Sequence, residues 1–328
     1  MKKKISSKSI QISIVIPLFN EEESLNELMT WINRVMSSHG FAYEVILIDD
    51  GSTDHSWDTI CTLSKEHPIR GFRFNRNYGK SAALNVGFAE ALGDVVVTMD
   101  ADLQDSPDEI PALYKLIKEG NHLVSGWKKK RHDPITKTIP SKFFNKVTRM
   151  ISGIRLHDFN CGLKAYDHRL IKTLNIYGEM HRYIPVIAKR NGFDKIVEKP
   201  VEHRARKYGK TKFGLSRFVY GFLDLISISF VSKYRKRPMH FFGSLGTLMF
   251  LIGFAFVMWI AGEKVYAIYV LKSSDYRDVV EQPLFFMALT SIILGMQLFL
   301  AGFIGEMMTM SNHKRSDYII FDSIDSVS

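Results

Sequence analysis

Two long uncharged runs near the end of this chain limit what it can fold into. Met239–Gly262 has 24 residues and Pro283–Gly305 has 23, and neither contains Asp, Glu, Lys or Arg. As a helix, each run would extend over roughly 35 Å, enough to cross a hydrocarbon core of about 30 Å. A buried helix of a soluble protein is the alternative. We predict a C-terminal two-helix transmembrane hairpin after a separate domain.

The positive charge of the chain gathers beside these runs. The net charge is +10, and basic residues precede the first run and follow the second: Lys233, Arg235, Lys236, Arg237, His313, Lys314 and Arg315. The positive-inside bias places both ends of the hairpin in the cytoplasm and the short loop outside. We therefore expect a multi-pass protein of the cell (inner or plasma) membrane. Basic charge at a membrane suits anionic headgroups or a phosphorylated lipid, and its position argues against nucleic acid as a partner.

Cysteine usage and the N-terminus favour a cytoplasmic location for the first domain. Cys61 and Cys161 are the only cysteines, and their spacing fits neither a disulfide framework nor a metal site. The basic N-terminus is not followed by an apolar core, because Ile10–Leu18 contains a proline and leads into a cluster of acidic residues. We expect no signal peptide.

Strand and helix patterns alternate through the first part of the chain. β-branched runs predict strands, and amphipathic segments between them predict helices. The expected strands are Ile12–Ile16, Val45–Ile48, Gly71–Phe74 and Val95–Met99, and the expected helices are Glu22–Met36, Asp54–Lys65, Lys80–Leu92 and one beginning near Pro107. This alternation predicts an α/β fold with a doubly wound sheet.

Two further segments have the character of interfacial helices. Apolar residues at helical spacing lie within 139–151, and Leu215–Val231 is apolar except at Arg217 and Asp224. Each segment either lies in the membrane interface or packs on the sheet. Its position beside the hairpin favours the interface for Leu215–Val231, whereas both interpretations stay open for 139–151.

The run at 95–105 carries the clearest chemical signal. Its β-branched part ends on Asp100 and Asp102, and side chains at i and i+2 of a strand project to the same face. They would stand at the carboxyl end of a central strand, where open α/β sheets bind ligands. Two adjacent carboxylates require a cation, and a hard divalent ion carrying a diphosphate fits. A solvated acidic loop is the alternative.

Other polar loops are expected at the same edge of the sheet. These are Pro17–Glu22, Asp49–Asp54 and Arg76–Ala83, where Gly79 permits close approach of a ligand and Lys80 stands at a helix N-terminus suited to phosphate. The dinucleotide-binding pattern G-x-G-x-x-G and the P-loop pattern G-x-x-x-x-G-K-[ST] are both absent from the sequence. That argues against a redox enzyme and a P-loop NTPase.

Together these motifs carry a family resemblance. The segments I-P-L-F-N-E-E-E-S, I-D-D-G-S-T-D, R-N-Y-G-K-S-A-A-L-N-V-G and D-A-D-L-Q-D resemble family 2 glycosyltransferases with the GT-A fold. Residues 10–215 look like the polyprenyl-phosphate glycosyltransferases, a group including dolichol-phosphate mannose synthase and bacterial undecaprenyl-phosphate glucosyltransferases. The resemblance implies a GT-A type, Rossmann-like mixed sheet. Ser106 departs from the family's frequent proline, which should affect only a helix cap.

The resemblance also implies roles for individual residues. It assigns nucleotide-sugar binding to Pro17, Phe19, Glu21, Asp50, Lys80 and Asp100, and Mg²⁺ or Mn²⁺ binding to Asp100, Asp102 and Gln104. Structural alternatives exist: Pro17 as a strand stop, Phe19 as core and Glu21 as a helix N-terminal acid.

The acceptor side is expected in two basic segments. The resemblance assigns the acceptor phosphate to Arg131, Arg206, Lys210 and Lys212, and the catalytic set to Asp102, Arg131, Arg206 and Lys212. The second segment resembles the family's R-x-x-G-x-S-K-Y, with Thr211 and Phe213 as departures. Arg and Lys suit a phosphate, although a basic face that holds the domain to anionic lipid is the alternative. Phe159–Lys164 corresponds to a family segment near the sugar site, with no single residue assigned.

These assignments predict inverting transfer of one hexose from a nucleotide sugar to undecaprenyl phosphate. UDP-glucose is the favoured donor and UDP-GlcNAc the next. A phosphate monoester is mostly dianionic near neutral pH, so no strong general base is required, and we expect Asp105 to be structural. Alternatives are a GDP-mannose-dependent mannose synthase and a non-catalytic nucleotide-sugar-binding scaffold. A processive synthase would need more spans and a Q-x-x-R-W motif, which this sequence lacks.

The predicted organisation has five parts. They are a basic tail at 1–9, a cytoplasmic catalytic domain at 10–214, a juxtamembrane helix and linker at 215–238, transmembrane helices at 239–262 and 283–306, and a cytoplasmic tail at 309–328. Small-residue faces in the spans predict a homo-oligomer, expected to be a tetramer, through Gly243, Gly246, Gly253, Gly295, Gly302 and Gly305.

Overall fold

The computed structural model describes residues 10–129, 145–150, 152–204, 207–208, 238–272, 277–311 and 320–325. The chain divides into two units, Met1–Leu225 with Asp317–Ser328, and Ile226–Ser316. The predicted juxtamembrane helix at Leu215–Val231 lies outside the described residues. Of the other predicted interfacial segment, residues 145–150 are described and are helical.

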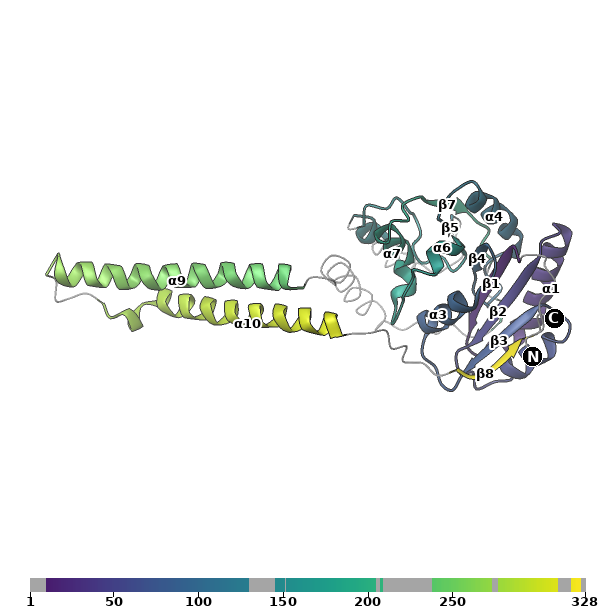
Figure 1. The fold of residues 1–328 in the computed structure, drawn as a ribbon, viewed down its shortest axis with the longest axis horizontal. Helices are drawn as coiled ribbons and strands as arrows, with labels where there is room; N and C mark the ends of the chain where they lie inside the picture. Colours follow the sequence, from purple (N-terminus) through teal and green to yellow (C-terminus); the bar gives the residue numbers. More distant parts are fainter. Residues whose placement is uncertain are drawn as a thin grey trace. The chain divides into compact units, whose positions relative to one another are not determined.

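Four parallel strands form the centre of the sheet in the first unit (Figure 1). They are neighbours in the order β4-β1-β2-β3, with bounds β1 Ile12–Leu18, β2 Tyr43–Asp49, β3 Ile69–Phe74 and β4 Val95–Thr98. Their side chains are almost entirely buried, as expected for a parallel sheet covered on both faces. All four predicted strands are confirmed.

The predicted stop of β1 at Pro17 is wrong. Pro17 is inside the strand and pairs with Ile48 of β2, while the pairing of β1 with β4 ends at Val15. Proline has no N–H to donate, so it is tolerated where one side of the strand no longer needs a ladder donor.

Three antiparallel pairings extend the sheet and make it mixed. β6 (Lys164–Asp167) lies antiparallel between β4 and β5 (Leu123–Trp127), and β7 (Ile196–Pro200) pairs parallel to β5. At the other edge β8 (Ile320–Asp325) pairs antiparallel with β3. The carboxyl ends of β1 to β5 and β7 therefore meet at one edge, which we call the rim, together with the amino end of β6.

Helices cover both faces of the sheet, as the predicted doubly wound fold requires. One apolar core joins Ile14 and Ile16 of β1 to α1, α2 and α4, whereas Val15 faces a second core with α3, α6 and α7. The alternation follows the two-residue period of a strand. The bounds are α1 Glu22–Ser38, α2 Ser56–Leu63, α3 Lys80–Glu90, η1 Pro107–Glu109, α4 Ile110–Lys118, α6 His168–Ile171, η2 Met180–Tyr183 and α7 Ile184–Arg190.

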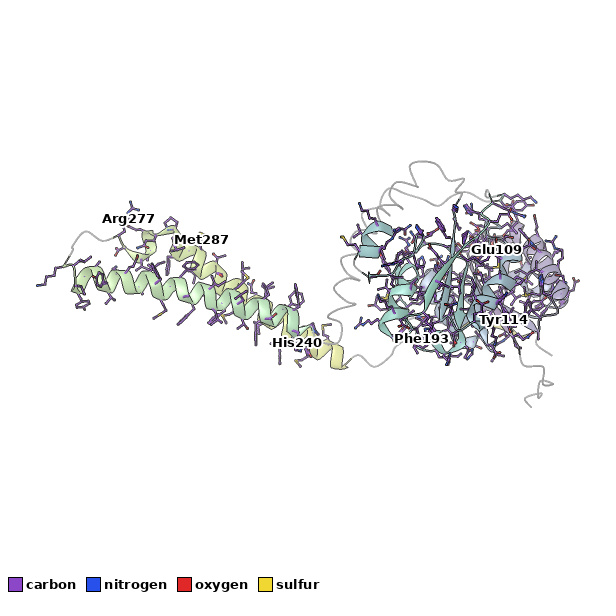
Figure 2. The ribbon with its side chains drawn as sticks, turned by 90° about the horizontal axis from the view of Figure 1, so that it is seen from above. Glu109, Tyr114, Phe193, His240, Arg277 and Met287 are labelled. Atoms are coloured by element: carbon purple, nitrogen blue, oxygen red, sulfur yellow. The ribbon has the colours of Figure 1, made fainter. Side chains whose placement is uncertain are left out.

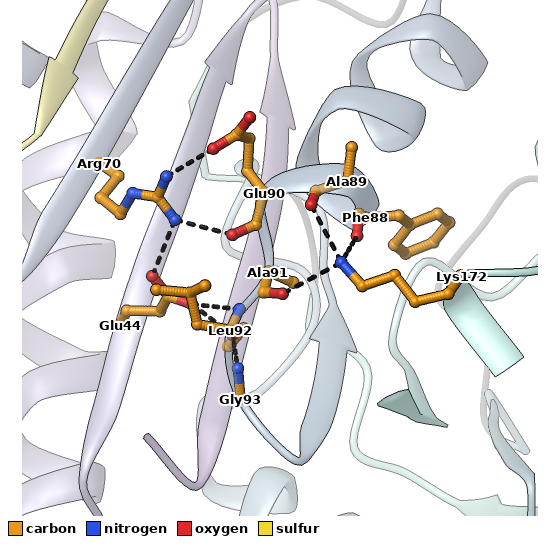
Figure 3. A network of polar contacts seen from close by, with 10 residues as sticks. Glu44, Arg70, Phe88, Ala89, Glu90, Ala91, Leu92, Gly93 and Lys172 are labelled. Atoms are coloured by element: carbon orange, nitrogen blue, oxygen red, sulfur yellow. Dashed lines mark hydrogen bonds and ion pairs between the residues drawn. The ribbon is translucent and has the colours of Figure 1, made fainter. Parts of the chain in front are cut away.

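A buried polar network lies at the amino ends of the parallel strands (Figure 3). Glu44 is fully buried, and its Oε1 accepts hydrogen bonds from Ser13 Oγ at 2.6 Å and Leu92 N at 2.8 Å. Arg70 donates to Glu44 Oε2 at 3.3 Å, and to the backbone and side-chain oxygens of Glu90 at 2.7 and 2.5 Å. We call these residues the amino-end network. It ties the end of α3 to three strands, and it leaves both carboxylate oxygens of Glu44 paired.

The second unit contains two helices that are long and apolar enough to cross a membrane. They are α9 (Met239–Tyr269) and α10 (Pro283–Ser311), joined through η3 (Val279–Glu281). In Figure 2 the labelled His240 and Arg277 lie near opposite ends of this hairpin. Large apolar side chains along both helices are exposed, which suits contact with lipid rather than water.

Four glycines of the hairpin lie between its own two helices: Gly246, Gly253, Gly295 and Gly302. A Cβ on Gly246 would come within 2.5 Å of Gly295 O, and one on Gly253 within 2.6 Å of Ala288 O. Ser291 Oγ also donates to Met249 O at 2.9 Å. We call this contact the glycine seam. The small-residue faces expected to join separate chains are used within one chain, so the predicted tetramer loses this support and stays a prediction.

Candidate active site

The loops after β1 and β2 are joined into one unit at the rim. Asn20 has a φ of 54°, and its N–H donates to Ser52 Oγ at 2.9 Å. In return Thr53 N donates to Asn20 Oδ1 at 2.8 Å, and Glu21 N donates to Ser56 Oγ at 3.0 Å. Because short polar side chains bond readily to nearby backbone, these Asn, Ser and Thr residues fix the two loops together.

The turn Asp49–Ser52 brings the loop after β3 against the same rim. Asp49 is buried, accepts from Ser52 N at 2.8 Å and lies 3.6 Å from Arg73 Nε. Gly51 has a φ of 74°, and a Cβ there would collide with the backbone of Arg76. Only glycine combines this conformation with so close an approach.

Asp50 organises the loop that leads into α3. Its two oxygens accept from Tyr78 N at 2.7 Å and Gly79 N at 2.9 Å, and the side chain is buried. Burial raises the pKa of Asp50, and the two N–H donors oppose that shift. Asp50 therefore holds Gly79, the N-cap of α3, in place. The nucleotide-sugar binding assigned to Asp50 stays a prediction.

Asp100 forms an ion pair with Lys80, so the structure brings two predicted donor-site residues together. Burial alone would raise the pKa of Asp100, but the charges of Lys80 and Lys128 outweigh it and lower this pKa to about 2. A Cβ on Gly162 would come 2.5 Å from Asp100 Oδ2. Gly162, from the Phe159–Lys164 segment, thus leaves the space that the carboxylate occupies.

Asp102 and Gln104 lie in the tight turn that follows β4. Leu103 has a φ of 61°, and Gln104 N donates to Asp102 Oδ1 at 3.3 Å. The side-chain amide of Gln104 donates to Arg204 O at 3.4 Å, so its oxygen is not committed to that bond. Metal binding by Asp102 and Gln104 stays a prediction.

The donor set at the rim fits a hard divalent cation. The described part of the chain contains no group of three or more His, Cys, Asp or Glu residues arranged for a metal. Mg²⁺ is commonly held by one or two carboxylates, with substrate phosphates and water completing its shell. Asp100 and Asp102 match that pattern for an ion that arrives with a diphosphate.

Asp105 is part of a buried ion pair that the sequence did not predict. Its carboxylate is fully buried, and Lys128 Nζ lies 2.9 Å from Oδ1. The neighbouring Cys161 thiol has its pKa raised to about 12 by burial and by Asp105, so it stays protonated. The pairing agrees with the structural role expected for Asp105. Lys128 follows β5 at the rim, so the rule applied to Asp102 could have found it.

His181 is a second site residue that sequence reasoning missed. It lies in η2, where its backbone N–H donates to Ser81 Oγ at 3.1 Å and its Nδ1 lies 3.2 Å from the same oxygen. Burial lowers the pKa of His181 well below its ordinary value, and Lys80 acts in the same direction. The imidazole is therefore neutral near pH 7 and secures η2 to the start of α3.

A cavity of about 190 Å³ lies beside the first rim loop. Its lining residues are Asn20, Glu21, Glu22, Glu23, Asp54 and Tyr208. Of the three β1-side residues assigned to the nucleotide sugar, Glu21 lines this cavity, and Pro17 and Phe19 are half-buried nearby in the chain. The residues predicted to bind the acceptor phosphate all lie outside the described residues: Arg131, Arg206, Lys210 and Lys212.

Comparison with known proteins gives matches over most of the chain. Residues 13–174 match the family model described as "Glycosyl transferase family 2". A dodecaprenyl-phosphate galacturonate synthase of Rhizobium johnstonii is 33% identical over 314 residues, covering 93% of this chain and 90% of that protein. An undecaprenyl-phosphate 4-deoxy-4-formamido-L-arabinose transferase of Shewanella sediminis is 38% identical over 222 residues, covering 67% and 64%.

Solved structures share the fold at lower identity. Glucosyl-3-phosphoglycerate synthase of Mycobacterium tuberculosis, in complex with Mn²⁺, UDP-glucose and phosphoglyceric acid, has a TM-score of 0.53 and 22% identity, covering 68% of this chain and 79% of that one. Mannosyl-3-phosphoglycerate synthase of Rubrobacter xylanophilus has a TM-score of 0.57 and 14% identity, covering 68% and 75%. The predicted GT-A type sheet is confirmed by these neighbours.

Proposed function

Because this chain belongs to glycosyl transferase family 2, we propose that it transfers one sugar from a nucleotide sugar to a polyprenyl phosphate at the cytoplasmic face of a membrane. The observation that carries the proposal is at the rim, where Lys80 holds Asp100 as a carboxylate two residues before Asp102 in the sequence. The names of both sequence relatives, each a polyprenyl-phosphate sugar transferase or synthase, support the lipid acceptor.

In this proposal the rim binds the donor through its diphosphate and nucleoside. Glu21 and Asp50, with Pro17 and Phe19, line the nucleoside side, and Lys80 stands at the N-terminus of α3 near the phosphates. Asp100, Asp102 and Gln104 would hold Mg²⁺ or Mn²⁺, which offsets the charge of a leaving diphosphate when bound. The mycobacterial synthase, solved in complex with Mn²⁺ and UDP-glucose, supports this choice.

The acceptor phosphate needs positioning more than activation. Mostly dianionic near neutral pH, it can attack the anomeric carbon without a strong base. Arg131, Arg206, Lys210 and Lys212 would orient it on the side opposite the diphosphate, so transfer inverts the anomeric centre. The rate then comes from orientation and charge stabilisation. The buried Asp105–Lys128 pair leaves Asp105 as a structural residue in this scheme.

The hairpin would anchor the first unit, which we call the catalytic unit in this proposal, beside its lipid substrate. Its two apolar helices fit two crossings, and with the positive-inside bias the flanking basic residues would put both ends in the cytoplasm. UDP-glucose remains the first donor to test and UDP-GlcNAc the second. The name of the Rhizobium relative adds a uronic acid to the candidates.

One experiment tests the reaction and the sugar together. Purified full-length protein with undecaprenyl phosphate and Mn²⁺ is given radiolabelled UDP-glucose, UDP-GlcNAc, UDP-galacturonate or GDP-mannose, and label extracted with the lipid is measured. We expect label from one donor and its loss with EDTA. Nucleotide-sugar binding without labelled lipid from any donor would instead favour the non-catalytic scaffold.

A further inference from the structure

The residues that follow β7 connect α1 to the loop Asp100–Asp105 after β4, which we call the D-x-D loop. We propose that Arg204 is a positioning residue, which holds Lys207 and Tyr208, the described residues of the acceptor-binding segment 206–212, on α1 beside the loop carrying Asp102. The inference rests on the proposed function, because it assigns the acceptor phosphate to that segment. It adds two residues, Arg204 and Trp31, that have no expected contact with either substrate.

The backbone of Arg204 is fixed to the D-x-D loop in both directions. Arg204 N donates to Gln104 O at 2.9 Å, and Gln104 Nε2 donates to Arg204 O at 3.4 Å. The preceding residue, His203, forms an antiparallel bridge with Asp105. The chain after β7 thus runs alongside the loop that contains the predicted metal ligands.

The side chain of Arg204 lies on α1. Its guanidinium carbon is 4.2 Å from the ring centroid of Trp31, within the range of a cation–π contact. Trp31 is nearly buried, and its Nε1 donates to Asp108 Oδ2 at 3.0 Å, which fixes the plane of the ring. Arg204 therefore rests on a platform that is itself attached to η1, the 3₁₀ turn after the D-x-D loop.

A second contact with α1 follows three residues later. Lys207 Nζ donates to Glu27 Oε2 at 2.6 Å, and Tyr208 OH donates to the same oxygen at 3.3 Å. Glu27 and Trp31 are four residues apart, so they lie on one face of the helix. Figure 2 shows Glu109, the last residue of η1, on this unit; Glu109 Oε1 accepts from Glu202 N at 3.1 Å.

These contacts hold the chain on both sides of Arg206. Arg204 stands before this residue, Lys207 and Tyr208 stand after it, and Tyr208 also lines the cavity beside Glu21. The assigned acceptor residues Lys210 and Lys212 follow directly in the sequence. Positions on α1 therefore determine where Arg204, Lys207 and Tyr208 lie relative to the donor loops.

The test separates position from charge. Arg204→Met removes the guanidinium, whereas Trp31→Leu removes the platform and keeps every charge. We expect each variant to raise the KM for undecaprenyl phosphate about three- to fivefold, with the KM for the nucleotide sugar and kcat changed less than twofold. The effect of the double variant should be smaller than the product of the two single effects, because both substitutions remove the Arg204–Trp31 contact. Each also removes a contact of its own, the Trp31–Asp108 bond at 3.0 Å and the Arg204–Glu202 ion pair at 3.3 Å. Arg204→Lys should restore most of the acceptor KM.

Arg34→Met is the matched control. Arg34 is on the same helix and lies 3.4 Å from Asp108, but no contact joins it to Arg204 among the described residues. Its acceptor KM should equal that of the wild type. If Trp31→Leu and Arg204→Lys leave the acceptor KM unchanged while Arg204→Met raises it, Arg204 acts only as a charge and the proposal is overturned.

Hydrogen–deuterium exchange of the full-length protein gives a readout that does not need transfer. Amides in 203–212 should exchange faster in Trp31→Leu and Arg204→Met than in the wild type or Arg34→Met. Equal exchange in all four proteins would contradict the positioning role. If the wild-type protein transfers no sugar, the proposed function fails, and the exchange result alone decides whether Arg204 fixes this segment.

Discussion

The catalytic unit has charged clusters at both ends of the same parallel strands, and they differ in how fully they are enclosed. In the amino-end network, Glu44 is 0% exposed, both of its carboxylate oxygens have protein donors, and its partner Arg70 is 10% exposed, whereas Glu90 is 37% exposed. At the rim, Asp100 pairs with Lys80, yet about a third of each side chain remains exposed, 35% and 32%. Both clusters combine carboxylates with cations. The Glu44–Arg70 pair of the first cluster is closed to solvent, and the Asp100–Lys80 pair of the second is open to a ligand.

This difference assigns the two clusters to different tasks. A buried ion pair with all partners present holds strands and helix together, and it becomes a large penalty when one partner is lost. An exposed pair at the end of a strand contributes little to stability, and its charges remain accessible to a substrate. Damage to the amino-end network should therefore lower stability, and damage to the rim should lower activity.

The largest expected effect is on stability. Glu44→Ala removes one of the two carboxylates that pair with the buried Arg70, together with the acceptor of Ser13 Oγ, and should destabilise the unit by about 3–5 kcal/mol. We expect a fall in Tm of about 10 °C, measured by thermal unfolding in detergent, with the activity of the folded fraction retained. Glu66→Ala, at an exposed position, is the control. An unchanged Tm would show that the network is dispensable.

The next effect is on activity. Asp102→Asn keeps the size of the side chain and removes its charge, so transfer of label to lipid should fall about 100- to 1,000-fold. The Tm should change by less than about 2 °C, because Asp102 is not buried. Asp58→Asn, whose side chain is 77% exposed in α2, provides the control. Transfer within twofold of the wild type would exclude Asp102 from the site.

A smaller loss of activity should follow from moving Asp100 without changing it. The methyl group of Gly162→Ala would stand 2.5 Å from Asp100 Oδ2, so the carboxylate must shift. Transfer should fall about tenfold or more, because small displacements at a reacting centre are costly. Gly262→Ala, where a Cβ meets nothing within 4 Å, should have no effect. Equal activities in the two variants would argue against a precise position for Asp100.

The smallest expected effect is a pH dependence of stability. The pKa of Asp100 is about 2 in the folded protein against an ordinary 3.8, so its contribution is present above about pH 4 and is lost as the pH falls through 2. Tm values of wild type and Asp100→Asn between pH 5 and 2 should therefore converge as the pH falls. A constant difference would mean that the folded and unfolded states share one pKa.

The parallel part of the fold could be predicted because each strand carries its own signal. The β-branched runs around Val45 and Val95 end on polar residues, and these ends define most of the rim. The four residues of β6 have no such pattern, since a short antiparallel strand is selected by its neighbours. β8 likewise pairs with β3 from within the segment expected to be a tail, and only tertiary structure reveals it.

The sequence predicted the carboxylates of the candidate site better than its cations. Asp100 and Lys80 could be placed from motifs, and the structure brings them together. The position of Lys128 at the end of a strand could have been found, but its pairing with Asp105 and that of His181 with Ser81 depend on contacts between segments distant in sequence. The hairpin glycines were recognised as packing positions, but sequence does not distinguish packing within a chain from packing between chains.

The glycine seam determines which positions of this hairpin tolerate substitution. Gly246 and Gly253 are seven residues apart, as are Gly295 and Gly302, and at each of these positions an added methyl group would meet the partner helix at 3.0 Å or closer. The outward positions between them carry exposed apolar side chains, where one lipid-compatible residue can replace another. In a saturation scan, intolerance should therefore recur once per heptad along both helices. The divergence of the spans in relatives would then be confined to their lipid-facing sides.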